Sequence, residues 1–148
     1  MKLSSLSQLQ SLSMSQNPIS RLQTSSFSHL REVESIYLNN MPNLAVIEKY
    51  AFVNLPKLKI LEMKNNKNLV HFGTKAFGNS VQSLQYLYLT NSAIEVFPET
   101  IMRNGDVLNF QLEKLDISGN PLSCDCHLNW IKKLPEVIGD PKADIEII

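Results

Sequence analysis

Apolar and polar residues alternate in the same way in five segments of the chain. In each segment, apolar side chains occupy the first, fourth and sixth places, and polar side chains occupy most of the places between them. The segments begin at Leu9, Val33, Leu58, Leu84 and Leu112. Their starts lie 24 (9 to 33), 25 (33 to 58), 26 (58 to 84) and 28 (84 to 112) residues apart, so the sequence predicts an internal repeat.

Each segment predicts one half-buried strand. Places four to six read apolar, polar, apolar, as in Leu12-Ser13-Met14, which is the pattern of a strand with one face in the core. Strands of successive repeats are expected to stack in parallel, because one repeat cannot bury its own apolar face. Later apolar residues complete the predicted core: Leu22, Ile47, Phe72 and Phe97, and three phenylalanines 25 residues apart, Phe27, Phe52 and Phe77.

Segments such as "LEKLDISGNPL" from Leu112 match the pattern L-x-x-L-x-L-x-x-N-x-L. With this pattern the chain resembles the leucine-rich repeat proteins. The resemblance implies an α/β leucine-rich repeat solenoid, with a curved parallel sheet on the concave face and short irregular or helical segments on the convex face. Residues 1–8 are then expected to be the tail of a preceding repeat, and residues 9–119 the repeats, with starts at 9, 33, 58, 84 and 112.

Asparagines follow every predicted strand: Asn17, Asn40, Asn65 with Asn66, Asn91, and Asn120. They could form a polar recognition strip. We favour a structural role, because backbone groups that leave a strand at a buried turn need partners, and a side-chain amide both donates and accepts.

The stretch "NPLSCDCHLNW", residues 120–130, holds the two cysteines of the chain, Cys124 and Cys126. A disulfide between them would close a small, strained ring. The stretch resembles N-P-x-x-C-x-C-x-L-x-W, the opening of the cysteine-rich C-terminal cap of extracellular leucine-rich repeat proteins. Residues 120–148 are therefore expected to be an incomplete cap. In that family both cysteines pair with later ones, and none follows Trp130, so the resemblance implies disulfides to residues outside this chain.

Repeats two and three, "LNNMPNLAVIEKYAFVNLPKL" and "MKNNKNLVHFGTKAF", look like repeats in the ectodomains of glycoprotein-hormone-type receptors. These resemblances imply an extracellular or cell-surface location in a full-length protein, with a cytoplasmic location as the alternative. The unfinished cap leads us to expect an in-frame extension past Ile148, with two cysteines within about 40 residues. More repeats and a signal peptide are expected before Met1.

Charge and hydropathy narrow the classes of partner. Fourteen basic and fourteen acidic residues cancel to a formal net charge of zero, which removes the basic surface expected of a nucleic-acid-binding protein. No stretch approaches the roughly 18 consecutive apolar residues of a membrane span, so we expect none within this chain.

Catalytic and metal-binding motifs are scarce. Cys124, Cys126 and His127 form a possible thiol or metal site, but zinc usually takes four ligands, and His29 and His71 lie two to four repeats away. Asp125 also opposes formation of a thiolate. The sequence has neither G-x-S-x-G nor a phosphate-binding glycine loop. We therefore expect no cofactor, no metal and no enzymatic activity, with a thiol or metal site as an alternative.

Places three, five and seven of the predicted strands face solvent on the concave side. They carry tyrosines, which cover a large area at low entropic cost and are frequent in interface hot spots. We therefore predict a surface for a protein ligand or receptor, formed by Tyr37, Ile60, Glu62, Lys64, Tyr86, Tyr88 and Asp116. Alternatively, the aromatic neighbours only stabilise the sheet, or the chain is part of an intracellular scaffold protein.

Overall fold

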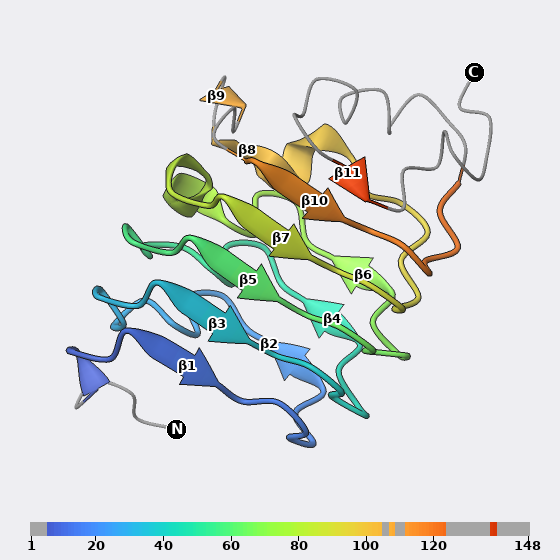
Figure 1. The fold of residues 1–148 in the computed structure, drawn as a ribbon, viewed down its shortest axis with the longest axis horizontal. Helices are drawn as coiled ribbons and strands as arrows, with labels where there is room; N and C mark the ends of the chain where they lie inside the picture. The colour runs from blue at the N-terminus through green and yellow to red at the C-terminus, as the bar shows by residue number, and fades with distance from the viewer. Residues whose placement is uncertain (1–5, 105–106, 109–111, 124–136, 139–148) are drawn as a thin grey trace.

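The computed structural model describes residues 6–104, 107–108, 112–123 and 137–138. Its main element is a parallel sheet of six strands in the order β1-β3-β5-β7-β10-β11 (Figure 1). The strands are β1 (Ser11–Ser13), β3 (Ser35–Tyr37), β5 (Ile60–Glu62), β7 (Tyr86–Tyr88), β10 (Lys114–Asp116) and β11 (Val137–Ile138). Each of the first five begins one residue before the apolar-polar-apolar triplet of its repeat. The arrangement confirms the predicted leucine-rich repeat solenoid.

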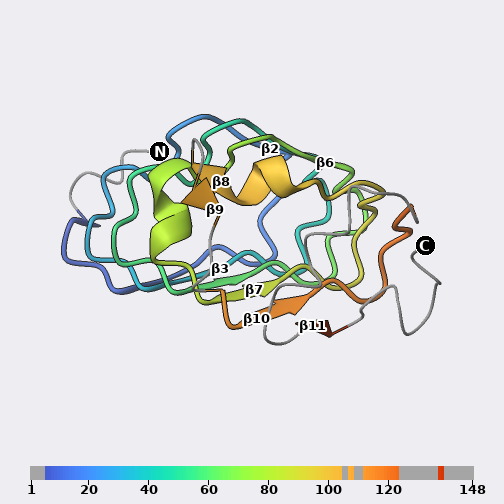
Figure 2. The ribbon, with the colours of Figure 1, turned by 90° about the horizontal axis from the view of Figure 1, so that it is seen from above.

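A second layer lies on the opposite side of the solenoid (Figure 2). It contains a parallel sheet of three two-residue strands, β2 (Arg21–Leu22), β4 (Val46–Ile47) and β6 (His71–Phe72). The 3-10 helices η2 (Gly78–Gln82) and η3 (Glu99–Met102) and the antiparallel pair β8 (Arg103–Asn104) and β9 (Val107–Leu108) follow. These short elements match the irregular or helical convex segments expected from the sequence.

The core lies between the two layers. The middle residue of each long strand points into it: Ile36, Leu61, Leu87 and Leu115 are fully buried, and Leu12 at the N-terminal end is half-buried. The residues on either side of each middle residue point outward, because successive side chains of a strand alternate between faces. The strand register therefore fixes which side chains can meet a partner.

Stacked phenylalanines run along the core from repeat to repeat. The ring centroids of Phe27 and Phe52 lie 5.5 Å apart, and those of Phe52 and Phe77 lie 5.4 Å apart. Phe72 packs 5.8 Å from Phe77 and 5.9 Å, edge-on, from Phe97. The 25-residue spacing of the sequence thus becomes a continuous aromatic stack that joins neighbouring repeats.

The turns after the strands explain the asparagines. Place eight of each repeat has a left-handed backbone, with φ between 54° and 73°, at Gln16, Asn40, Asn65, Asn91 and Gly119. Asparagine and glycine tolerate this conformation better than most residues. At place nine, the buried Asn66 donates from Nδ2 to the Leu38 carbonyl and accepts from the Met41 N–H, each at 2.9 Å. The predicted structural role is confirmed for Asn66.

Among the described residues, the last strand of the six-stranded sheet is β11, which pairs in parallel with β10 through Leu115 and Val137. Cys124, Cys126 and the rest of the expected cap stretch to Trp130 lie outside the described residues, so the incomplete cap stays a prediction. No helix in the described part of the chain is long and apolar enough to cross a bilayer.

Candidate protein-binding surface

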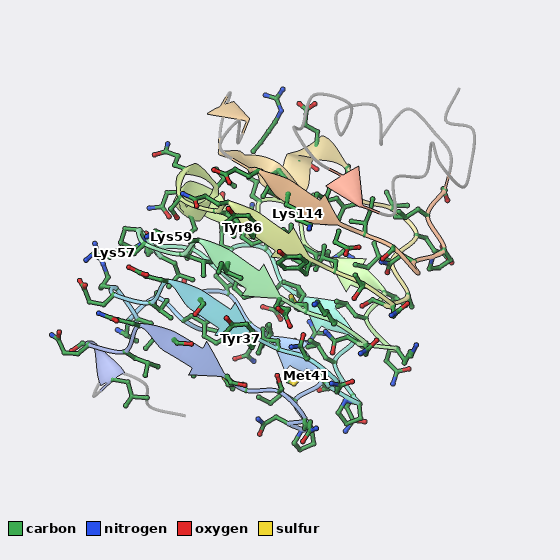
Figure 3. The ribbon with its side chains drawn as sticks, viewed as in Figure 1. Tyr37, Met41, Lys57, Lys59, Tyr86 and Lys114 are labelled. Atoms are coloured by element: carbon green, nitrogen blue, oxygen red, sulfur yellow. The ribbon has the colours of Figure 1, made fainter. Side chains whose placement is uncertain are left out.

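The outward side chains of β1, β3, β5, β7 and β10 form one surface, which we call the sheet face. Parallel register places Tyr37, Glu62, Tyr88 and Asp116 side by side in one row. A second row contains Ser35, Ile60, Tyr86 and Lys114. Figure 3 shows Tyr37, Tyr86 and Lys114 over the strands of this sheet.

All seven residues predicted for the binding surface belong to the sheet face and are half-buried. Six lie in the two rows, and Lys64 follows β5 by two residues. The structure thus brings them together across four neighbouring strands. Whether they bind a partner stays a prediction.

Tyr88 lies at the centre of the charged part of this surface. The Nζ atom of Lys64 is 5.0 Å from its ring centroid, and the Nζ atom of Lys114 is 6.0 Å away. Both distances are within the range of a cation–π interaction. Both ammonium groups are thus close enough to interact with the tyrosine ring. Lys114 was missing from the predicted set, although place three of the fifth repeat points to it.

Carboxylates of the sheet face already have donors within the chain. Glu62 accepts a hydrogen bond from Asn39 Nδ2 at 2.9 Å and lies 3.7 Å from Lys64 Nζ. Asp116 accepts from the Ser118 hydroxyl at 2.7 Å. These contacts orient the carboxylates of the sheet face.

The N-terminal end of the sheet face has a different character. Ser11, Ser13 and Ser35 supply small hydroxyl groups there, and the Ser35 hydroxyl donates to that of Ser11 at 3.0 Å. This end has no charged side chain on β1. The aromatic and charged residues are therefore concentrated from Tyr37 of β3 to Asp116 of β10.

Two ion pairs away from the sheet face shift the pKa of their members. The hydrogen bond from Arg21 holds the pKa of Glu48 below its usual value, and the hydrogen bond to Glu32 raises the pKa of Lys57. Both pairs join neighbouring repeats at the surface, at 2.9 Å and 2.6 Å. Such exposed pairs add little stability, and they are not part of the candidate site.

Metal ligands do not gather in the described part of the chain, where no group of three or more His, Cys, Asp or Glu side chains could hold an ion. His29 and His71 are both exposed. Cys124, Cys126 and His127 lie outside the described residues, so the alternative thiol or metal site stays untested.

Comparison with known families agrees with the fold. Residues 3–118 match the model of the BspA type Leucine rich repeat region in six copies. The chain belongs to the leucine-rich repeat family. Residues 111–139 of this leucine-rich repeat protein also match the general Leucine Rich Repeat model.

Individual relatives of this leucine-rich repeat protein include receptors. The chain is 26% identical to Tsukushi of Gallus gallus over 96 residues, which are 64% of this chain and 26% of that protein. It is 26% identical to the thyrotropin receptor of Sus scrofa over 113 residues, or 76% of this chain. The mouse thyrotropin receptor is also 26% identical, over 112 residues. The chain spans 14% of either receptor. These matches confirm the resemblance to hormone-type receptors.

Proposed function

We propose that this chain is a non-catalytic protein-interaction module that binds a protein ligand or receptor on its sheet face. One observation carries the proposal: Tyr37 of β3 and Tyr86 and Tyr88 of β7 lie on the outward side of the sheet and remain half-exposed, with Ile60 on β5, the strand between them. Outward tyrosines next to an outward isoleucine are costly to leave in water. They become favourable when a partner covers them.

The contact surface is expected to extend from β3 to β10 and to leave β1 uncovered. Rigid aromatic groups surrounded by charged groups are typical of interface centres, with the charges acting at the rim. Tyr88, held between Lys64 and Lys114, is the best candidate for the centre. The serines near β1 offer little area to a partner.

An extracellular or cell-surface location is part of this proposal. It is supported by the similarity to thyrotropin receptors, which are named as receptors. Because the chain spans a small part of each relative, it is expected to supply one part of a longer binding surface. Binding by leucine-rich repeats is then the function, with no reaction performed by this segment.

The test begins with a panel of purified secreted proteins and receptor ectodomains, probed with the chain to find a partner. Tyr88→Ala and Tyr37→Ala are then measured against that partner by surface plasmon resonance. We expect at least one of them to weaken binding by about 1–4 kcal/mol, the usual range for an interface hot spot.

Lys75→Ala on the opposite side of the solenoid serves as the control and should leave the affinity unchanged. A triple variant with alanine at Tyr37, Tyr86 and Tyr88 that binds as tightly as the unmodified chain would place the contact on another surface. Equal losses from the sheet-face variants and from Lys75→Ala would have the same meaning.

A further inference from the structure

A hollow with apolar walls lies on the side of the solenoid opposite the sheet face. It has a volume of about 410 Å³ and lies between β6 and residues 93–98. Val70 and Val96, two of the large hydrophobic side chains that the chain exposes, line it at 59% and 48% exposure. Phe72 and Pro98 add further apolar walls. We call this hollow the β6 cleft.

Backbone chemistry explains why the cleft opens here. In the two preceding turns, the Glu48 N–H donates to the Leu22 carbonyl at 2.9 Å, and the Gly73 N–H donates to the Ile47 carbonyl at 2.8 Å. Pro98 stands 25 residues after Gly73, in the equivalent place, and has no N–H to donate to the Phe72 carbonyl. Within the described residues, no backbone donor from residues 93–98 reaches that carbonyl.

As a consequence, the three-stranded sheet gains no fourth strand from residues 96–97. Residues 96–97 occupy the place of a fourth strand, yet the sheet ends at β6. The Phe72 carbonyl points toward this gap, because the Ile47 carbonyl, one turn earlier, points the same way and is paired. The cleft therefore combines a hydrogen-bond acceptor with apolar walls, which are the two requirements for binding an extended peptide segment.

Charge on the cleft rim indicates the sign of the partner. Glu95 is exposed and lines the cleft. Ion pairs in the described part of the chain involve other carboxylates, and none of them includes Glu95. His71, on the same rim, is also exposed. A basic group on a partner would thus find a carboxylate that is in no ion pair with the described residues of this chain.

We propose that the β6 cleft binds an extended, basic segment of a partner protein. An aliphatic side chain of that segment fills the hollow between Val70 and Val96, and its backbone N–H donates to the Phe72 carbonyl. A lysine or arginine two residues away on the same face of the segment reaches Glu95. The site is separate from the sheet face, which lies on the other side of the solenoid (Figure 2), so both can be occupied together.

A short synthetic peptide provides the probe. It has five residues with blocked ends: threonine at the first, third and fifth positions, valine at the second and lysine at the fourth. Titration into the isotope-labelled chain, followed by amide NMR shifts, should give saturable changes confined to residues 70–74 and 95–97. A control peptide with aspartate for valine and glutamate for lysine should give none.

Substitutions in the chain separate the three contacts. Val96→Asp should weaken peptide binding about tenfold or more, because it places a charge beside the hollow. Glu95→Gln should weaken it about two- to fivefold, the size of an exposed ion pair, and should reduce its salt dependence. Glu34→Gln, an exposed carboxylate paired with Lys59 elsewhere, is the matched control and should change nothing.

Pro98→Ala tests the cleft most directly, because alanine supplies the backbone N–H that Pro98 lacks. If the new donor pairs with the Phe72 carbonyl, the cleft should close and peptide binding should fall, while the fold is retained. The proposal is overturned if both peptides bind equally, if no shifts appear in the cleft, or if Val96→Asp binds as well as the unmodified chain. Concentration-dependent shifts of the cleft amides without peptide would overturn it too, since a second copy would then be the occupant.

Discussion

Place nine of the fourth repeat contains a polar residue that does not fulfil the role of Asn66 and Asn120. Asn66 and Asn120 both donate from Nδ2 to the carbonyl at place six of the preceding repeat, Leu38 and Leu89, at 2.9 Å and 2.6 Å. In the fourth repeat the place is taken by Ser92. Its hydroxyl is buried and has no partner within the described part of the chain. A shorter side chain at this place leaves a buried polar group unsatisfied.

We therefore expect Ser92→Asn to stabilise the chain by about 0.5–1.5 kcal/mol, the net value of one hydrogen bond. The longer amide should reach the Met63 carbonyl, which is equivalent to that of Leu38. Urea unfolding followed by circular dichroism provides the measurement. Asn66→Ser is the matched reverse change and should destabilise the chain. A loss of stability from Ser92→Asn would show that the fourth turn has no room for the amide.

These turns show what the sequence can and cannot tell at single positions. The recurrence of asparagine predicted that side chains satisfy the turn backbone, and Asn66 does so. The sequence did not separate place eight, where a left-handed backbone favours Asn40, Asn91 and Gly119, from place nine, where the amide points inward. The backbone conformation distinguishes the two places, and the pattern of residue types along the sequence does not reveal that conformation.

At the scale of elements, the phenylalanine stack joins the repeats. Phe52 is fully buried and stacks on Phe27 and Phe77, whereas Phe27, also buried, stacks among the described residues on Phe52 alone. Phe52→Ala is expected to cost about 3–5 kcal/mol of unfolding free energy. Phe27→Ala should cost less, because it empties a place near the end of the stack. Chemical denaturation of the two variants checks the order. An equal or larger loss for Phe27→Ala would mean that stacking adds nothing beyond burial.

The long strands were predictable and the short ones were not. Three-residue strands such as β5 lie in a six-residue apolar pattern that repeats five times, so their place and direction follow from the sequence. The strands β2, β4 and β6 have two residues each, too few to show a period of two. Only their inward residues, Leu22, Ile47 and Phe72, were recognised, as core anchors. The end of this sheet at β6 depends on Pro98, and its effect becomes clear only once the equivalent donors Glu48 and Gly73 are known.

At the scale of the whole molecule, repeat register also predicted most of the candidate site. All seven chosen residues lie on one face because the strands stack without a shift. The contacts of these side chains could not be predicted from the sequence. The contact of Lys114 with Tyr88 and that of Asn39 with Glu62 depend on side-chain conformation. The β6 cleft was missed for a related reason: a missing N–H matters only in relation to the carbonyl that it fails to reach.

The N-terminal end and the middle of the solenoid also differ in how firmly they are held. Within the described residues, β1 pairs with β3 alone, whereas β5 lies between β3 and β7. Leu12 of β1 is half-buried, and Leu61 of β5 is fully buried. Because repeats contact only their neighbours, the stability of each depends on how many neighbours it has. The N-terminal repeat should therefore open before the central ones.

Hydrogen exchange measures this gradient at two equivalent amides. The Met14 N–H donates to the Tyr37 carbonyl at 2.9 Å, and the Met63 N–H donates to the Tyr88 carbonyl at 2.8 Å. We expect Met14 to exchange through local opening and Met63 only through unfolding of the whole chain, so its protection should be at least about tenfold greater. For the same reason, Leu61→Ala should lower the free energy of unfolding by about 2–5 kcal/mol, and Leu12→Ala should lower it by less than half as much. Equal protection of the two amides would instead mean that the stack from Phe27 to Phe77 couples all repeats into one cooperative unit, in which the end is as stable as the middle.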